Sequence, residues 1–332
     1  MANTLLAPDT GFWKVDLGTE KDYWTAYEAM RPSYAGSSFL DIIYDYHSSK
    51  PNPPTFGVAH DVGCGFGKAT IEIVKRFQSV VASDSNESSL AAAQKRLDLL
   101  AKNVKFSQRT GEQLGEYYPA QSADFIGAAE CIPLMESTVA LSGFAKVLKP
   151  NGTLAIWFYG RAHFSEQEYK STCQPLFDQI MNLIWAKVIN SGGPESQATW
   201  KRAANGMASW LDNLDFSSGD WGLIQRRKWN AKSAKMGFSC EACDFEIETT
   251  NNVKNDEEVI EIEDPEFWKG AWNIHGVMNY MYSSFPGIQE RVATDVEINE
   301  LFLKLATAMG GENTVRHHTW PVVLVLATRL GS

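Results

Sequence analysis

The chain contains the stretch Asp61-Val62-Gly63-Cys64-Gly65-Phe66-Gly67, and no other segment says more about its architecture. An apolar run at 56–59 precedes it, and the residues after it have the apolar spacing of a helix, with Ile71, Val74 and Phe77. A strand, a glycine turn and a helix in this order are typical of parallel sheets, and glycines let the turn approach a ligand closely. The stretch therefore predicts an α/β fold with a ligand site after its first strand.

The spacing of the glycines separates the classes of glycine loop. A dinucleotide loop of the form GxGxxG needs a glycine where Lys68 stands, so a nicotinamide oxidoreductase is disfavoured. A Walker loop needs a glycine at Val62 and a serine or threonine at Ala69, and it has neither. A structural turn without a ligand is the alternative that remains beside a cofactor site.

The pattern Asp-x-Gly-x-Gly-x-Gly resembles motif I of class I S-adenosylmethionine-dependent methyltransferases. The resemblance implies that the backbone of Gly63, Cys64, Gly65 and Gly67 wraps the methionine end of S-adenosylmethionine. Asp61 precedes the glycines. A carboxylate suits this place because the ammonium and sulfonium groups of the cofactor are cationic.

Polar residues after the next strands extend the predicted cofactor site. Asp84 ends the second apolar run, where a carboxylate can accept both ribose hydroxyls, and Ser85 follows it. A helix N-cap is the structural alternative for Asp84. By the same resemblance, Gly111 and Glu112 occupy the adenine end after the third strand. Glu130 reaches the methyl-donor end after the fourth strand.

Alternating β-rich and helical segments predict the organisation of the chain. We expect strands at 56–62, 79–83, 103–107, 123–128, 153–159 and 322–326. The expected fold class is α/β, a Rossmann-like class I methyltransferase sheet that is mostly parallel, with an antiparallel final strand and a helical cap. The expected parts are an N-terminal helical lid at 1–50, a cofactor-binding core at 51–160, a helical cap or substrate region at 161–316 and the final strand at 317–332.

Segments at both ends of the chain are similar to fungal trans-aconitate methyltransferase-like enzymes, namely 27–34, 275–283 and 320–327. The resemblance implies that Tyr27 and Arg31 contact the cofactor and that Asn279 and Tyr280 face the substrate. The family has an arginine in this substrate-facing helix, and this chain has lost it. Because a guanidinium is the natural partner of carboxylates, the loss argues against a tricarboxylate and favours a less polar specialised metabolite.

Methyl transfer from a sulfonium needs an aligned nucleophile and the exclusion of water more than it needs a catalytic triad. A carboxylate or phenolate acceptor attacks directly, whereas an amine or phenol needs a base, for which His275 and His318 are candidates. Structural roles for both histidines are the alternative. Trp24, with its tyrosine neighbours, is predicted to form an aromatic lid and to contact the substrate.

Composition limits the partners of the chain. The formal net charge of −10 disfavours nucleic acids and anionic membranes. The run Arg226-Arg227-Lys228 is interpreted as a solvated strand or helix end, and the lone CxxC of Cys240 and Cys243 as half-buried thiols instead of a metal site. We expect a cytoplasmic enzyme with a small-molecule substrate and no metal. The oligomeric state stays open.

Two alternatives keep the cofactor site but change the function. One is a regulatory protein that binds S-adenosylmethionine without methylating. The other is a methyltransferase fold recruited for cyclisation or rearrangement, in which the positive charge of the cofactor assists a reaction without methyl loss.

Overall fold

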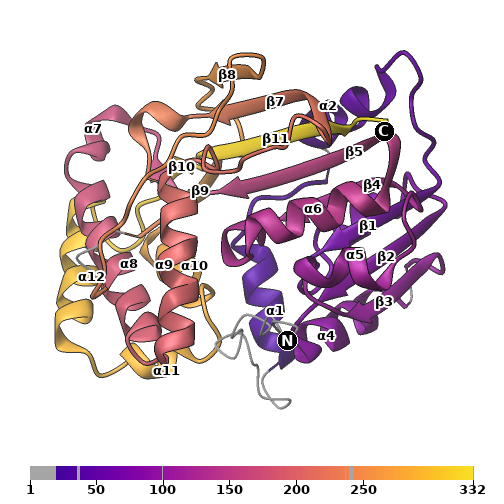
Figure 1. The fold of residues 1–332 in the computed structure, drawn as a ribbon. Coiled ribbons are helices and arrows are strands. Elements are labelled where there is room, and N and C mark those ends of the chain that lie inside the picture. The colour runs from indigo at the N-terminus through magenta and orange to yellow at the C-terminus, as the bar shows by residue number, and fades with distance from the viewer. Residues whose placement is uncertain (1–19, 36–37, 99, 236, 239–242, 332) are drawn as a thin grey trace.

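The computed structural model describes residues 20–35, 38–98, 100–235, 237–238 and 243–331, and Figure 1 shows their arrangement. Cys240 and residues 1–19 of the predicted N-terminal segment lie outside the described residues. An eight-stranded sheet forms the core, in the order β3-β2-β1-β4-β5-β11-β7-β8. Its strands are β1 (Val58–Val62), β2 (Ser79–Asp84), β3 (Val104–Gln108), β4 (Ala123–Ala129), β5 (Leu148–Tyr159), β7 (Trp221–Trp229), β8 (Glu258–Ile262) and β11 (Val322–Arg329).

Strands β1 to β5 run parallel, so their carboxyl ends meet at one edge of the sheet. The crossover helices between them are α3 (Thr70–Ile73), α4 (Glu87–Leu97), α5 (Leu114–Tyr117) and α6 (Ser137–Val147). Both faces of the sheet are covered. The ring of Phe77 contacts Phe125 on one face, and Tyr118 contacts His60 on the other. Burial on both faces explains why β4 and the second half of β5 read as nearly continuous apolar runs.

The predicted final strand is confirmed as β11, which pairs antiparallel with β5. Its residues from Val322 to Ala327 are at most 1% exposed. It does not form the edge of the sheet, because β7 pairs with its other side.

The expectation of a helical segment at 161–316 is wrong in part, because β7 and β8 join the main sheet. This segment contains strands as well as helices. Residues of β7 alternate in burial, but the inward positions include Arg226 and Lys228. Charged side chains at core positions conceal the alternation of apolar and polar residues by which a strand is recognised.

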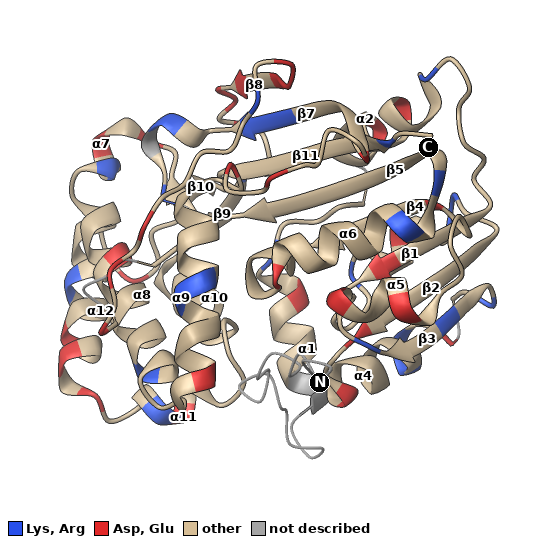
Figure 2. Cartoon of the chain, viewed as in Figure 1, with Lys and Arg blue, Asp and Glu red and all other residues tan. Residues whose placement is uncertain are grey.

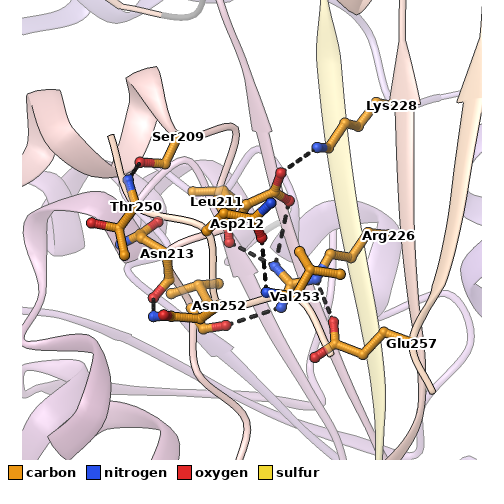
Figure 3. A network of polar contacts seen from close by, with 12 residues as sticks. Ser209, Leu211, Asp212, Asn213, Arg226, Lys228, Thr250, Asn252, Val253 and Glu257 are labelled. Carbon is orange, nitrogen blue, oxygen red and sulfur yellow. Dashed lines mark hydrogen bonds and ion pairs between the residues drawn. The ribbon is translucent and has the colours of Figure 1, made fainter. Parts of the chain in front are cut away.

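The interpretation of the run Arg226-Arg227-Lys228 as solvated is also wrong, because Arg226 is fully buried. The run colours part of β7 blue in Figure 2, and Figure 3 shows its partners. Arg226 Nε donates to Glu257 at 2.5 Å, and its two terminal nitrogens donate to the carbonyls of Leu211 and Leu214 at 2.8 and 2.9 Å. This network joins the loop that contains Leu211 and Leu214 to strand β7 of the main sheet.

The rest of the segment forms the cap, which Figure 1 shows as a group of helices beside the core. Its helices are α7 (Gln167–Lys170), α8 (Cys173–Ile189), α9 (Pro194–Ala208), α10 (Ile274–Tyr282), α11 (Ile288–Val292) and α12 (Val296–Ala308). A small sheet of β6 (His163–Phe164), β10 (Arg316–Thr319) and β9 (Gly270–Trp272) connects the cap to the core.

Two helices precede the core, α1 (Glu20–Ala29) and α2 (Ser38–Ser48). Helix α1 lies between the cap and the core in Figure 1, whereas α2 packs on the sheet, where Phe39 contacts Trp157. In the part of the chain that the structure describes, no helix is both long and apolar enough to cross a bilayer.

Candidate active site

Two adjoining chambers lie at the carboxyl edge of the parallel strands. We call the first the loop chamber, because the turns after β1 to β4 line it together with α1. We call the second the cap chamber, because it lies between the end of β5 and the cap helices. Residues shared by both linings are Tyr27, Glu130, Leu134 and Tyr159.

The structure brings most of the predicted cofactor residues together in the loop chamber. The predicted residues that line it are Trp24, Tyr27, Asp61, Gly63, Cys64, Gly65, Asp84, Ser85, Gly111, Glu112 and Glu130. Two of the predicted cofactor residues do not line it. Arg31 lines the cap chamber instead, and Gly67 packs away from the chamber, where an added Cβ would lie 2.9 Å from Leu97.

The glycine turn owes its shape to backbone angles that favour glycine. Gly63, Gly65 and Gly67 have φ of +64°, +54° and +86°, which lie in the left-handed region. An added Cβ at Gly63 would approach Cys131 Cβ to 2.5 Å, whereas one at Gly65 would meet nothing within 4 Å. Gly63 therefore serves packing, and Gly65 leaves open space.

Asp61 is fully buried below this turn. Its Oδ2 accepts a hydrogen bond from Thr70 Oγ1 at 2.5 Å, and its Oδ1 is buried without a partner among the described residues. Burial raises the pKa of Asp61 to about 7, and the nearby Asp84 adds to the rise. An orphaned buried acceptor is costly unless a donor completes it, so Oδ1 fits a cationic ligand group.

Asp84 holds the turn from the other side. Its Oδ2 accepts from Gly65 N at 2.9 Å and its Oδ1 from Asn86 N at 2.8 Å. The N-cap of α4 is Asn86, whose side chain accepts from Ser89 N at 3.1 Å. Asp84 is therefore not the helix cap that was its alternative. Its carboxylate lines the chamber, where each oxygen keeps a lone pair for a further donor.

Glu112 and Glu130 supply two further carboxyls. Glu112 Oε1 accepts from Glu136 N at 2.9 Å, and its Oε2 is buried without a partner among the described residues. Glu130 has φ of +61°, and its Oε1 accepts from Tyr159 N at 2.7 Å. Burial raises the pKa of Glu130 well above its ordinary value, although the hydrogen bond from Tyr159 N and the charge of Arg31 lower it. This strained residue stands where the two chambers meet.

Helix α1 covers the chambers with aromatic rings. Trp24 stacks on Phe66 of the glycine turn with ring centroids 5.0 Å apart, and Tyr27 meets Phe66 edge-on at 5.4 Å. Arg31 connects the end of this segment to the cap by donating to Ser283 Oγ at 3.0 Å. The predicted aromatic lid thus lies over the loop chamber, and Trp24 lines that chamber but not the cap chamber.

The cap chamber is mainly aromatic. Its ring-bearing lining residues include Phe158, Trp185, Trp200, Tyr280 and Phe285. Tyr280 therefore has the placement predicted for a substrate residue. The predicted substrate residue Asn279 is exposed and lines neither chamber, because α10 turns this position toward solvent.

Neither predicted base reaches the chambers, which corrects the expectation for both histidines. His275 is exposed and pairs with Glu312 at 3.0 Å. His318 stacks on Trp272 with ring centroids 3.4 Å apart and lines a separate cavity of about 10 Å³, which holds one water at most. Burial lowers the pKa of His318 to about 3. Among the described residues, no cluster of three or more ligating side chains is placed to hold a metal ion.

Sequence reasoning missed Arg161 and Tyr159, which line the cap chamber at the end of β5. A signal was present: the rule that singled out Asp84 and Glu130, a polar residue at the end of a parallel strand, also reaches Arg161, which follows the last residue of β5 after one glycine. No comparable sequence signal placed Trp185 and Trp200 in the lining of the cap chamber, because tryptophans in helices fill cores as often as pockets.

Comparisons with known proteins agree with this geometry. Residues 59–152 match the family model described as a methyltransferase domain. The chain is 41% identical over 337 residues to the methyltransferase pgmE of Aspergillus terreus, across 99% of this chain and 100% of that protein. It is 35% identical over 316 residues to the methyltransferase cfoB of Aspergillus candidus, across 94% of this chain and 96% of that protein.

A solved structure shares the fold. It is that of a candidate type II methyltransferase of Anaeromyxobacter dehalogenans, with a TM-score of 0.56 at 17% identity over 91% of this chain and 99% of that chain. The near-complete match to the fungal relatives and the Asp61 to Gly67 loop at the edge of a Rossmann-like sheet lead to one conclusion: the chain belongs to the class I S-adenosylmethionine-dependent methyltransferases.

Proposed function

We propose that the loop chamber binds S-adenosylmethionine and that the protein transfers the methyl group to a small organic molecule in the cap chamber, at oxygen or nitrogen of a carboxylate, phenol or amine. The observation that carries the proposal is the common wall of the two chambers, formed by Tyr27, Glu130, Leu134 and Tyr159. A donor in one chamber and an acceptor in the other would meet at this wall.

The chain's own residues fit the cofactor. The unpartnered Oδ1 of Asp61 suits the methionine ammonium group, and the carboxylate of Asp84 suits the ribose hydroxyls. Gly111 and Glu112 lie in the lining for the adenine end, and Glu130 for the sulfonium end. When bound, S-adenosylmethionine supplies a methyl carbon made electrophilic by the adjacent positive sulfur.

The protein's main contribution would be to orient the acceptor and to exclude water. Alignment of two reactants is worth up to roughly 7 to 11 kcal/mol of barrier in favourable cases. The rings of Trp24, Tyr27 and Phe66 cover the loop chamber and keep solvent from the reacting atoms. The relatives come from Aspergillus species, which supports a fungal specialised metabolite as the acceptor.

Calorimetry with S-adenosylhomocysteine tests the cofactor half of the proposal, and the expected result is saturable binding with one site per chain. Incubation of the protein with donor labelled in the methyl group and a panel of aromatic acids, phenols and amines tests the other half. Mass spectrometry should find a product heavier by one methyl group. No binding of S-adenosylhomocysteine would refute the proposal, and a product of unchanged mass would favour cyclisation or rearrangement.

A further inference from the structure

Arg161 occupies an unusual place for a charged side chain. It follows β5 directly after Gly160, lines the cap chamber and is only 4% exposed. Two residues of helix α8 accept hydrogen bonds from its guanidinium. Nη1 donates to Asp178 O at 3.3 Å, and Nη2 donates to Asn182 Oδ1 at 2.5 Å. Asp178 is also its ion-pair partner at 3.8 Å. These contacts fix the orientation of the group.

One nitrogen of the Arg161 guanidinium has no hydrogen-bond partner among the described residues. Its Nε–H is buried and has no partner among the described residues. A guanidinium has five donors in a rigid plane, and leaving one of them buried and unpaired is unfavourable. An oxygen of a molecule in the cap chamber would complete the set, as a cationic ligand group completes Asp61 in the loop chamber.

The charges around the cap chamber decide which kind of oxygen fits. The charged side chains in its lining are Arg31, Arg161 and Glu130. Arg31 donates to Ser283 and to the carbonyl of Tyr280, so the hydrogen-bond partners of its guanidinium among the described residues are uncharged. Glu130 is a carboxyl whose neutral form burial favours. With Asp178 set against Arg161, the positive charge of Arg31 remains in excess, and this excess attracts an anion and repels a protonated amine.

The shape of the acceptor follows from the rings. Trp185 meets Trp200 edge-on at 5.5 Å and Phe285 at 5.3 Å between centroids. Met181 and Met207 complete the apolar lining, and methionines adapt to irregular shapes. Rigid rings on several sides favour a planar aromatic body over a flexible aliphatic acid.

Resting on the function proposed above, we propose that Arg161 selects the methyl acceptor by donating its Nε–H to the anionic oxygen of an aromatic hydroxyl compound. The phenol gives its proton to water before or on binding. A lone pair of the phenolate oxygen then forms the new carbon–oxygen bond while the carbon–sulfur bond breaks and its electron pair stays on sulfur. No histidine base is required, which agrees with the places of His275 and His318.

A coloured probe tests this assignment without methyl transfer. We choose 4-nitro-1-naphthol, whose anion absorbs visible light, and 4-nitro-1-naphthylamine as its uncharged isostere. With S-adenosylhomocysteine present, the protein should bind the naphtholate about 10-fold to 100-fold more tightly than the amine, the range of a charge-assisted hydrogen bond. The absorbance should also show that the bound naphthol ionises at lower pH than it does in water.

Arg161→Met removes the charge at similar length, and this variant should lose both the preference for the anion and the shift in ionisation. Arg161→Lys, which keeps the charge, should retain part of both. Arg227→Met makes the same exchange at a half-buried arginine of β7 that lines neither chamber, so it should behave as the wild type. Circular dichroism and calorimetry with S-adenosylhomocysteine show whether each variant remains folded with an intact loop chamber.

The outcomes separate this proposal from the function on which it rests. If S-adenosylhomocysteine does not bind, the proposed function itself fails. If it binds but the wild type does not bind the naphtholate or does not prefer it, the assignment of Arg161 is overturned. An equal preference in a folded Arg161→Met variant overturns it as well. Loss of the preference in Arg161→Met alone, with Arg227→Met unchanged, supports it.

Discussion

Asp61 is the residue at which ligand binding and stability oppose each other. Its carboxyl group is fully buried, and only one of its oxygens has a hydrogen-bond partner among the described residues. Burial of an incompletely paired carboxylate destabilises the empty protein. The same unpaired oxygen is what a cationic ligand group requires, so the site holds a charge that the fold by itself does not favour.

Asp61→Asn should therefore stabilise the empty protein while weakening the binding of S-adenosylhomocysteine. At pH 8 the wild type carries a buried charge that asparagine lacks, and the free energy of unfolding should rise by up to about 4 kcal/mol. At pH 5 the wild-type carboxyl is mostly neutral in the folded protein but still ionised in the unfolded chain, so the gain should fall to about 1.5 kcal/mol. Urea denaturation at both pH values and calorimetry measure the two effects. Asp45→Asn, at an exposed position of α2, should change neither.

The affinity for S-adenosylhomocysteine should depend on pH through the same group. The pKa of Asp61 is raised to about 7 in the empty protein, and a bound ammonium group favours the ionised form. Affinity should therefore be full above pH 7 and fall below it, by at most about tenfold per pH unit for one group. Titration calorimetry between pH 5 and pH 8 checks this. A flat profile, or one that Asp61→Asn leaves unchanged, would contradict it.

At the scale of an element, the three glycines of the turn differ in whether they pack against side chains or border the loop chamber. All three of its glycines have positive φ, but their surroundings differ. Gly63 lies against Cys131, Gly67 lies against Leu97, and Gly65 borders open space in the loop chamber. The motif is thus part packing and part binding surface.

Alanine substitutions should separate these demands. Gly63→Ala adds both backbone strain and a Cβ 2.5 Å from Cys131 Cβ, so we expect the free energy of unfolding to fall by about 3 kcal/mol or more. Gly65→Ala adds strain alone, about 1 to 2 kcal/mol. Denaturation in urea measures the difference. Equal losses in the two variants would mean that the contact with Cys131 is unimportant.

At the scale of the whole molecule, both chambers lie at one edge of the sheet, and buried polar contacts attach the cap to the sheet. The buried pair of Arg226 and Glu257 connects β7 to the segment before β8 and to the loop that follows α9 (Figure 3). Helix α9 contributes Trp200 and Met207 to the cap chamber. The network therefore keeps one wall of the acceptor site in position relative to the strands that hold the cofactor site.

Glu257→Gln should reduce the stability of the protein but not its affinity for S-adenosylhomocysteine. Removing the charge of Glu257 leaves buried Arg226 with only its longer ion pair to Asp212, at 3.7 Å, and the expected loss is about 3 kcal/mol in the free energy of unfolding. The matched variant Glu258→Gln alters an exposed carboxylate of β8 and should be close to neutral. Thermal and urea unfolding measure stability. A similar loss in both variants would argue against a special role for the buried pair.

Local pattern was sufficient for the part of the chain that forms β1 to β5. The turn at 61–67, the carboxylates at Asp84 and Glu130 and the apolar strands could all be predicted, because each depends on residues close together in the sequence. The carboxyl ends of parallel strands meet by rule, so residues from separate loops could be assigned to one site before any contact was known.

Tertiary structure decided the features that depend on distant partners. Strand β7 is recognisable only once Glu257 and Asp212 are seen to neutralise its buried charges. Arg161 gains its proposed role because α8 binds its terminal nitrogens and it lines the same chamber as the tryptophans of the cap. His318 loses its predicted role because it stacks on Trp272 away from both chambers. These roles depend on burial and on contacts between residues far apart in the chain, and neither can be predicted from neighbouring residues in the sequence.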